Sequence, residues 1–346
     1  ISSAKKLLKK NRLLFGTVDT FLIWKLTKKK LHATDATNAS RTMLYNIKKN
    51  KWDKDLLKMF KIPIKILPKV KNSADDFSYT DKSITGKPYS IRGVIGDQQA
   101  AIIGQGCFSE GSVKFTYGTG AFVMINTGSK LVTSRNKLLS TICYKINDKT
   151  TYAIEGSIFV AGASIQWLRD RLKIIVHAKQ SENISKNLKI NSDVYFVPAF
   201  TGLGAPHWIP EARGIISGLT RDTGQNEIVR AALQSVVYQS TDLLNAMKDD
   251  GLTPSLIKVD GGMTQNNWFN QFLADISNLK VLKPKTQETT ALGAALIAAL
   301  GAGIFKSLSQ IAKKNRISRQ FTPKMNKKIR LKLLNGWSQA IRKTII

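Results

Sequence analysis

The sequence contains little cysteine and little histidine, with two cysteines and three histidines among its 346 residues. Two cysteines are too few for a disulfide scaffold, and neither Cys107 nor Cys143 lies in a CxxC or mixed Cys/His cluster. We therefore predict that both thiols are reduced and buried, in a cytoplasmic protein. The histidines are scattered without metal-ligand spacing, so the sequence predicts no zinc site.

The sequence also lacks a long hydrophobic run. The longest apolar stretch, residues 291–305, is rich in alanine and glycine. It is shorter than the ~18 residues that a membrane span requires, and it predicts a buried helix. The lysine-rich segment 5–10 is not followed by an apolar stretch of the signal-peptide type. We therefore expect a protein without a membrane span.

Acidic residues are scarce. The chain has 23 Asp and Glu residues and 54 Lys and Arg residues, and its net charge is +31. Such a charge can be the footprint of nucleic-acid binding. The basic residues are spread along the whole chain, however, and the sequence is rich in Lys, Asn and Ile together, which AT-rich codons favour. We favour a solvated surface biased by genome composition, with no specific nucleic acid as partner.

The chain does contain enough apolar sequence for a large core, with 42% hydrophobic residues. Its length predicts two domains or one very large one. Strand-like and helix-like segments alternate, which predicts an α/β fold, and we place a domain boundary near residue 105. Helices are predicted at 52–60, 163–173, 226–249 and around 269–276; strands are predicted at 89–95, as two strands within 114–126, as a strand pair within 151–160, and at 256–260.

The segment Gly96-Asp97-Gln98-Gln99 joins a predicted strand to the start of a predicted helix. A carboxylate in this position faces exposed backbone N–H groups and the positive end of the helix dipole. It therefore stays ionised and can accept a proton from a substrate hydroxyl, while the amide of Gln98 suits a polyol. Taken alone, the segment favours the simpler interpretation that Asp97 is a helix N-cap.

Two glycine-containing turns are candidate phosphate sites. Residues 116–122 place glycines on both sides of Thr119, and residues 259–266 place paired glycines between a strand and a helix. Glycine lets backbone N–H groups approach phosphate oxygens, and ligands of α/β folds bind beyond the carboxyl ends of strands. Taken alone, each turn fits an ordinary hairpin or strand-to-helix connection as well. Neither GxxxxGK[ST] nor GxGxxG after a strand is present, which disfavours P-loop NTPases and dehydrogenases.

Seven segments in one order give the strongest signal, and through them the chain resembles the glycerol kinases of the FGGY carbohydrate kinase family. The resemblance runs from about residue 13 to the C-terminus. The segments are 15–25 (FGTVDTFLIWK), 37–44 (TNASRTML), 96–101 (GDQQAA), 116–120 (TYGTG), 161–168 (AGASIQWL), 198–206 (PAFTGLGAP) and 259–262 (VDGG).

This resemblance implies two α/β domains of the actin-like ATPase (ribonuclease H-like) fold, with residues 1–104 the C-terminal part of the first domain and residues 105–346 the nucleotide-binding second domain. It implies ATP-dependent phosphorylation of glycerol to glycerol 3-phosphate, with Mg²⁺ on the phosphates, by a dimer or tetramer of identical chains. Asp97 would be the general base, Gln98 would bind a neighbouring hydroxyl, and Phe122 would pack on the carbon backbone of glycerol. The nucleotide would be bound by Thr119 at its phosphates and by Gly162, Gln166, Gly262 and Asn266.

The sequence departs from the family pattern in two places. The family begins with an Asp-x-Gly-Thr-Thr phosphate loop that this sequence lacks. We therefore expect a truncated first domain, in a fragment of an intact enzyme. The smaller departure is His207 and Ile209, where the family tends to have Tyr and Asp around Trp208.

Two rival functions stay open at this point. One is a kinase of the same family that acts on another polyol or a pentulose. The other is an inactive remnant that binds nucleotide or nucleic acid. Phe122 and the tryptophan-containing segment 15–25 favour glycerol over other acceptors.

Overall fold

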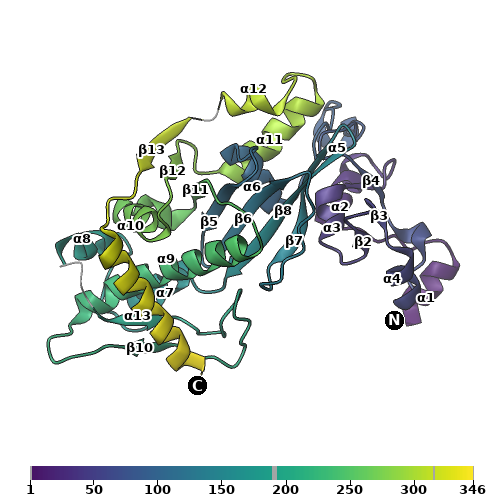
Figure 1. The fold of residues 1–346 in the computed structure, drawn as a ribbon. Coiled ribbons are helices and arrows are strands. Elements are labelled where there is room, and N and C mark those ends of the chain that lie inside the picture. Colours follow the sequence, from purple (N-terminus) through teal and green to yellow (C-terminus); the bar gives the residue numbers. More distant parts are fainter. Residues whose placement is uncertain (1, 189–192, 315, 346) are drawn as a thin grey trace.

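The computed structural model of the chain describes residues 2–188, 193–314 and 316–345. Within these residues, a seven-stranded mixed sheet is the largest element (Figure 1). β11 runs parallel to β5 and β12, and the other neighbouring strands are antiparallel. From edge to edge the sheet consists of β13 (Ile317–Phe321), β12 (Val281–Pro284), β11 (Leu256–Asp260), β5 (Ser112–Tyr117), β6 (Ala121–Gly128), β8 (Lys149–Ile158) and β7 (Leu139–Ile146).

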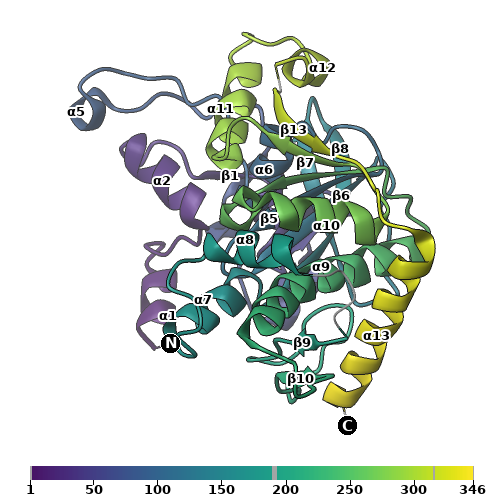
Figure 2. The same ribbon diagram turned by 90° about the vertical axis from the view of Figure 1, so that its left-hand side faces the viewer.

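Helices cover both faces of this sheet (Figures 1 and 2). Odd-numbered β5 residues such as Val113, Phe115 and Tyr117 belong to the large core beneath one face, because side chains alternate between the faces of a strand. That face is covered by α7 (Gly162–Asp170), α9 (Gln225–Asp249) and α10 (Asn267–Ser277), and α13 (Lys327–Ile345) packs against α9. The opposite face carries α6 (Asp97–Gln105) and α11 (Thr289–Gly301), which form a second core with β6, β7 and β8.

The N-terminal part of the chain lies beside β7, at one edge of the sheet (Figure 1). Ala36 and Ala39 of its third helix pack against Ile142 of β7, so that this part is attached to the sheet by an apolar contact. Its elements are α1 (Ser2–Lys9), α2 (Val18–Leu26), β1 (Ala33–Asp35), α3 (Ala36–Ser40), β2 (Tyr45–Asn46), β3 (Lys51–Trp52), α4 (Lys54–Met59), η1 (Ile64–Ile66), β4 (Lys69–Lys71) and α5 (Lys82–Thr85).

The remaining elements lie outside the seven-stranded sheet. β9 and β10 form a two-stranded antiparallel sheet, and η2 connects β11 to α10. Their bounds are α8 (Gln180–Asn187), β9 (Tyr195–Val197), β10 (Ile215–Ser217), η2 (Gly262–Gln265) and α12 (Leu308–Ala312).

Most of the predicted elements are confirmed, and two strand predictions are wrong. Residues 89–95 make only isolated bridges with residues 74–79, because the partner segment turns out of the extended conformation at Ser78 (φ 74°). The strand pair predicted within 151–160 is the single strand β8, whose hairpin partner β7 precedes it. The turn between them is Asn147-Asp148, with positive φ at both residues as a type I′ hairpin requires.

The apolar segment 291–305 does contain a helix, but the prediction that this helix is buried is wrong for most of its surface. Within α11 only Thr289, Gly293 and Ile297 are buried. Gly293 faces Gly104 of α6, and at each glycine an added Cβ would overlap a backbone carbonyl of the other helix. The helix is therefore one-sided, and small residues allow it to lie unusually close to α6. In the part of the chain that the structure describes, no helix is long and apolar enough to cross a membrane.

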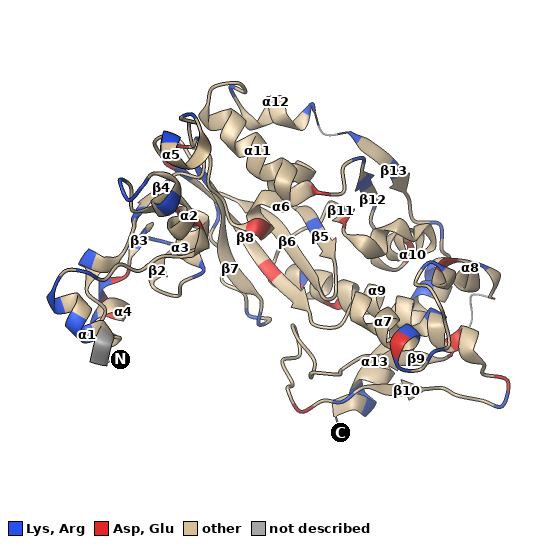
Figure 3. Cartoon of the chain, turned by 180° about the vertical axis from the view of Figure 1, so that it is seen from behind, with Lys and Arg blue, Asp and Glu red and all other residues tan. Residues whose placement is uncertain are grey.

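Both cysteines are free and buried, as predicted. Burial raises the pKa of Cys107 to about 11, which keeps this thiol protonated. Lys and Arg residues are distributed over elements at both ends of the molecule (Figure 3), as their spread along the sequence predicts.

Candidate functional site

Asp97 and Gln98 occupy the first turn of α6. The N-cap of this helix is Gly96, whose N–H donates to the hydroxyl of Thr37 (2.8 Å). Asp97 is the first helical residue and is exposed, and its Oδ1 accepts a hydrogen bond from the backbone N–H of Gln98 (2.7 Å). The simpler interpretation of Asp97 as the N-cap is therefore wrong. Its carboxylate remains accessible at the positive end of the α6 dipole.

A buried lysine lies directly beneath this turn. Lys114 of β5 is 0% exposed, and its Nζ donates to Oε1 of Gln98 (2.5 Å). Burial lowers the pKa of Lys114, and the negative charges of Asp260, Glu155 and Asp97 act in the opposite direction. An alternating pattern does not distinguish such a lysine from a solvent-facing one, so the sequence analysis missed it.

Strand register places Lys114 in a row that contains three charged side chains, on the α6 face of the sheet. Lys258, Lys114, Met124 and Glu155 are register neighbours across β11, β5, β6 and β8. The next row towards the ends of β5 and β11 contains Asp260, Thr116, Phe122 and Ser157. Both rows face the same side, because side chains two residues apart on a strand point the same way.

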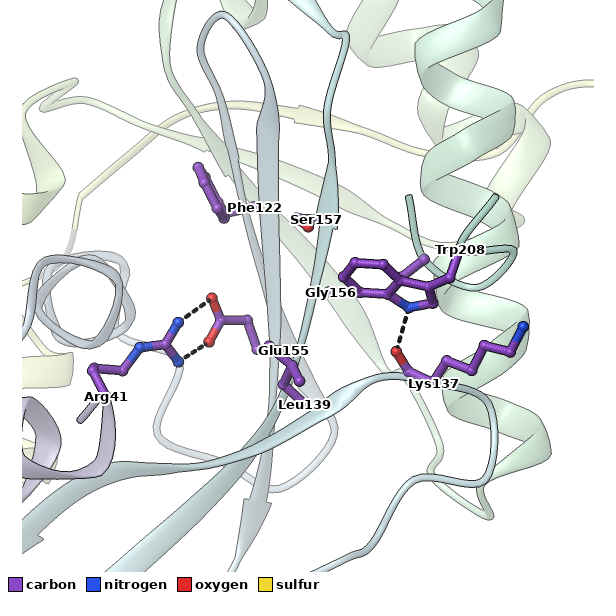
Figure 4. Close-up of a pocket in the computed structure, with 9 residues that line it drawn as sticks. Arg41, Phe122, Lys137, Leu139, Glu155, Gly156, Ser157 and Trp208 are labelled. Carbon is purple, nitrogen blue, oxygen red and sulfur yellow. Dashed lines mark hydrogen bonds and ion pairs between the residues drawn. The ribbon is translucent and has the colours of Figure 1, made fainter. Parts of the chain in front are cut away.

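Phe122 lines a pocket of about 130 Å³ (Figure 4). This residue is 42% exposed. Opposite the ring, Arg41 and Glu155 form a bidentate ion pair, with N–O distances of 2.5 and 3.3 Å, and this pair connects the N-terminal part to β8. Asp97 does not line this pocket. The lining residues are Arg41, Phe122, Lys137, Leu139, Glu155, Gly156, Ser157, Ala205 and Trp208.

Of the two residues that depart from the family pattern, His207 lies next to this pocket. Its backbone carbonyl accepts from Nζ of Lys137 (2.9 Å), and its ring lies 3.9 Å from Asp242. Trp208 lines the pocket and donates through Nε1 to the carbonyl of Lys137 (2.8 Å). The departure at His207 therefore lies beside the Phe122 pocket, next to the lining residue Trp208.

The predicted phosphate residues gather where two glycine turns meet the start of α7. The carbonyl of Thr119 accepts from the N–H groups of Ala161 (2.9 Å) and Ala163 (3.0 Å), and the carbonyl of Gly118 accepts from Gly162 (3.0 Å). A Cβ at Gly162 would lie 2.6 Å from the carbonyl oxygen of Gly118, so only glycine fits there. Thr119 is exposed, and its hydroxyl makes no hydrogen bond with any described residue, which leaves it available to a ligand.

The second glycine turn, which contains Gly261 and Gly262, completes this group. Gly261 has φ 91°, and a Cβ there would overlap the carbonyl of Tyr117, so this position requires glycine. Gly262 is exposed, and a Cβ there would meet nothing within 4 Å. Its neighbour Met263 reaches within 3.7 Å of the Cβ position of Gly162, so the two turns are adjacent.

Gln166 and Asn266 differ in how free their side chains are. Gln166 is exposed on α7, one turn after Gly162 and on the same side of the helix. Asn266 is the N-cap of α10, and its Oδ1 accepts from the N–H of Phe269 (2.9 Å). Its Nδ2 lies 3.4 Å from the hydroxyl of Ser181. Asn266 therefore has a structural task in addition to any contact with a ligand.

The predicted site residues thus form two groups. Thr119, Gly162 and Gly262 lie together around the glycine turns. Asp97 and Gln98 lie at the start of α6, connected through Lys114 to the same strand, β5, that ends at the first glycine turn. Sequence analysis missed the buried charges of this arrangement, Lys114, Glu155 and Asp260.

Two family models match the chain. The FGGY family of carbohydrate kinases, N-terminal domain, matches residues 2–104, and the C-terminal domain of the same family matches residues 113–302. The expectation of a truncated first domain is not borne out by these matches.

The chain is similar to curated and solved proteins over nearly its whole length. It is 51% identical to "Glycerol kinase" of Rhodospirillum centenum over 344 residues, which is 99% of this chain and 69% of that protein. It is 49% identical to "Glycerol kinase" of Coxiella burnetii, covering 100% of this chain and 69% of the relative. The structure of Plasmodium falciparum glycerol kinase with ADP matches with a TM-score of 0.94 and 39% identity, over 99% of this chain and 69% of that chain.

Proposed function

Because the chain belongs to the FGGY family of carbohydrate kinases and has their two-domain actin-like ATPase fold, we propose that it transfers the γ-phosphoryl group of ATP to glycerol. The product would be glycerol 3-phosphate. The observation that carries the proposal is the exposed Asp97 carboxylate on the first turn of α6, beside a Gln98 amide that is held by Lys114. The similarity to glycerol kinases at about half identity supports glycerol as the acceptor.

Asp97 would act as the general base. Its Oδ1 accepts a hydrogen bond from the N–H of Gln98, which orients the carboxylate, and Oδ2 would be the oxygen that meets an acceptor hydroxyl. A terminal hydroxyl within hydrogen-bond distance of that oxygen would pass its proton to Asp97 as it attacks the γ-phosphorus. Gln98 would bind a neighbouring hydroxyl, and the ring of Phe122 would pack on the carbon backbone of glycerol.

The nucleotide would lie against the glycine turns. Thr119, with its unengaged hydroxyl, would contact the phosphates, and Gly262 would let the chain approach the nucleotide without a Cβ in the way. Gln166, exposed on α7 next to Gly162, and Asn266 at the start of α10 would line the same region. The similar glycerol kinase of Plasmodium falciparum was crystallised with ADP, which supports a nucleotide as a ligand of this fold.

Mg²⁺ would be bound chiefly by the phosphates. Among the described residues there is no group of three or more His, Cys, Asp or Glu side chains that could hold a metal by itself. Mg²⁺ needs no such group in kinases, because one or two carboxylates together with substrate phosphates and water suffice. The ion would supply charge neutralisation on the phosphates.

The remaining parts of the proposal follow the family resemblance. We propose ATP and glycerol as substrates, a homodimer or homotetramer as the assembly and the cytoplasm as the location. The domain boundary is proposed near residue 105, between α6 and β5. The basic surface is proposed to have no specific nucleic acid partner, and such a partner would bind with a steep loss of affinity as salt rises.

The test is a coupled assay of ADP release with glycerol, a pentulose and no acceptor, using the chain and its Asp97→Asn variant. We expect ATP-dependent phosphorylation of glycerol, with glycerol preferred over the pentulose. Removal of the base should lower kcat by roughly 10²- to 10⁴-fold and leave nucleotide binding intact. A chain that binds nucleotide but phosphorylates no acceptor would support the inactive-remnant alternative. An Asp97→Asn variant with full activity would refute the assigned base.

A further inference from the structure

The amide of Gln98 is oriented by a group that the proposed chemistry does not use. Nζ of Lys114 lies 2.5 Å from Oε1 of Gln98. An ammonium group can only donate hydrogen bonds, so the atom of Gln98 that faces it must be the oxygen. The NH₂ group of Gln98 is thereby directed elsewhere, and it makes no hydrogen bond with any described residue. Without Lys114, the two ends of the amide would be free to exchange places.

Lys114 cannot contact a substrate itself, because it is completely buried on β5. Its ammonium makes no hydrogen bond to another described residue besides Gln98, and no carboxylate of the described residues lies within 4 Å of it. A buried ammonium with so few partners is costly. Carboxylates of Asp97, Glu155 and Asp260 surround it at longer range and compensate part of that cost.

Its neighbour in the sheet provides a contrast. Lys258 is the register partner of Lys114 on β11 and points to the same face. Its ammonium donates to the carbonyls of Gln105 and Gly106 (2.8 Å each), at the end of α6. Lys258 thus stabilises the C-terminal end of α6, where carbonyls lack helical partners. Lys114 contacts the opposite end of the same helix, at the predicted acceptor site.

We propose that Lys114 is a positioning residue that fixes Gln98 with its NH₂ group towards the acceptor, so that the amide donates to an acceptor oxygen. The inference rests on the proposed function for the identity of the acceptor. The same arrangement would make the site specific for one class of acceptor. An NH₂ group held in this way favours an acceptor with an oxygen lone pair next to the attacking hydroxyl. A vicinal diol or polyol supplies that oxygen.

The kinetic test is a double-mutant cycle with Lys114→Met, Gln98→Ala and the double variant. Lys114→Met should raise the KM for glycerol about 10-fold, the size expected for a lost hydrogen bond to a charged group, and leave the KM for ATP within about 2-fold. In the Gln98→Ala background, Lys114→Met should change the KM for glycerol by less than about 2-fold, because its effect passes through Gln98. Equal effects in both backgrounds, or an equal rise in both KM values, would overturn the proposal.

Lys258→Met is the matched control. It removes a lysine from the same face and the same register row, and it should lower thermal stability without changing the ratio of the two KM values. If Lys258→Met reproduces the kinetic pattern of Lys114→Met, the effect is a general consequence of burying an altered side chain under α6, and the positioning role is refuted.

Two further measurements decide the case if Lys114→Met does not fold or if the chain does not phosphorylate glycerol. Gln98→Glu retains an oxygen for Lys114 but has no N–H, so it should fold as the wild type does and lose glycerol affinity as Gln98→Ala does. In ¹⁵N-glutamine-labelled protein, the side-chain amide resonances of Gln98, assigned by their loss in Gln98→Ala, should move in Lys114→Met and stay in place in Lys258→Met. An unchanged resonance in Lys114→Met refutes the contact whatever the substrate is. A moved resonance in a chain without glycerol kinase activity would retain the contact and refute the proposed function alone.

Discussion

The close approach of α6 and α11 leads to the sharpest prediction about how the fold holds the candidate base. Asp97 begins α6, and Gly104 near the other end of that helix faces α11. A Cβ at Gly104 would lie 2.7 Å from the carbonyl carbon of Thr289, closer still to its oxygen, and 3.1 Å from the backbone nitrogen of Gly293. Both obstacles are backbone atoms, so no side chain can rotate out of the way.

The magnitude follows from these distances. Carbon atoms pack at about 3.5 Å or more, so Gly104→Ala must move the two helices apart by roughly 1 Å. Overpacking of this kind typically costs about 1–3 kcal/mol, and the higher helix propensity of alanine returns at most about 1 kcal/mol. We expect a net loss of about 2 kcal/mol in the free energy of unfolding. A displacement of about 1 Å at Asp97 would also lower kcat/KM by about 10²-fold.

The assay combines urea unfolding with steady-state kinetics for Gly104→Ala and for Gly224→Ala. Gly224 is the N-cap of α9, and a Cβ there would meet nothing nearer than 3.4 Å, so this variant should lose at most about 1 kcal/mol of stability and keep the wild-type kcat/KM. A Gly104→Ala protein with the wild-type unfolding midpoint and kcat/KM would refute the argument that α6 is held by contact with α11. Loss of stability without loss of activity would refute only its link to Asp97.

Two smaller predictions concern other parts of the chain. Gly262→Ala should leave the unfolding midpoint unchanged and weaken nucleotide binding. Gly261→Ala should destabilise the fold, because this position has φ 91° and an added Cβ would overlap a carbonyl. Isothermal titration with ADP and urea unfolding distinguish the two variants, and equal stability of the pair would contradict the assignment. Hydrogen bonds from the side chain and backbone of Ser83 lower the pKa of Asp81 from its ordinary value of 3.8 to about 2. The contribution of the Asp81 carboxylate to the free energy of unfolding is therefore complete above about pH 4 and is lost as the pH falls towards 2. Asp81→Asn should therefore be less stable than the wild type at pH 6 and equal to it near pH 2 by urea unfolding, and a difference that persists at the lower pH would contradict this explanation.

Much of the candidate site could be predicted because its residues lie in short, local motifs. Asp97 and Gln98 follow one another in the chain, and each glycine turn is a continuous segment. Backbone requirements are also local, because positive φ at Gly261 and close approach at Gly162 leave glycine as the residue that fits. The roles drawn from these motifs came from the family resemblance, since each motif alone also fits an ordinary cap or turn.

The residues that sequence analysis missed owe their position to long-range pairing. Lys114 and Glu155 are 41 positions apart, and they come into one row only because β5, β6 and β8 pair in a particular register. A one-residue shift in register would turn each of these side chains to the other face. No local pattern records which register forms.

The sequence by itself determined the class of fold, most helices and strands, and the chemical types of the residues in the two groups of the candidate site. Periodicity and glycine positions carry that information, because they act over a few residues. Only the tertiary structure decided that segment 89–95 makes isolated bridges, that α11 is exposed on one side, and that Lys114 holds the oxygen of Gln98. Each of these depends on which distant segment lies opposite, and burial, register and contact between helices arise only when the whole chain packs.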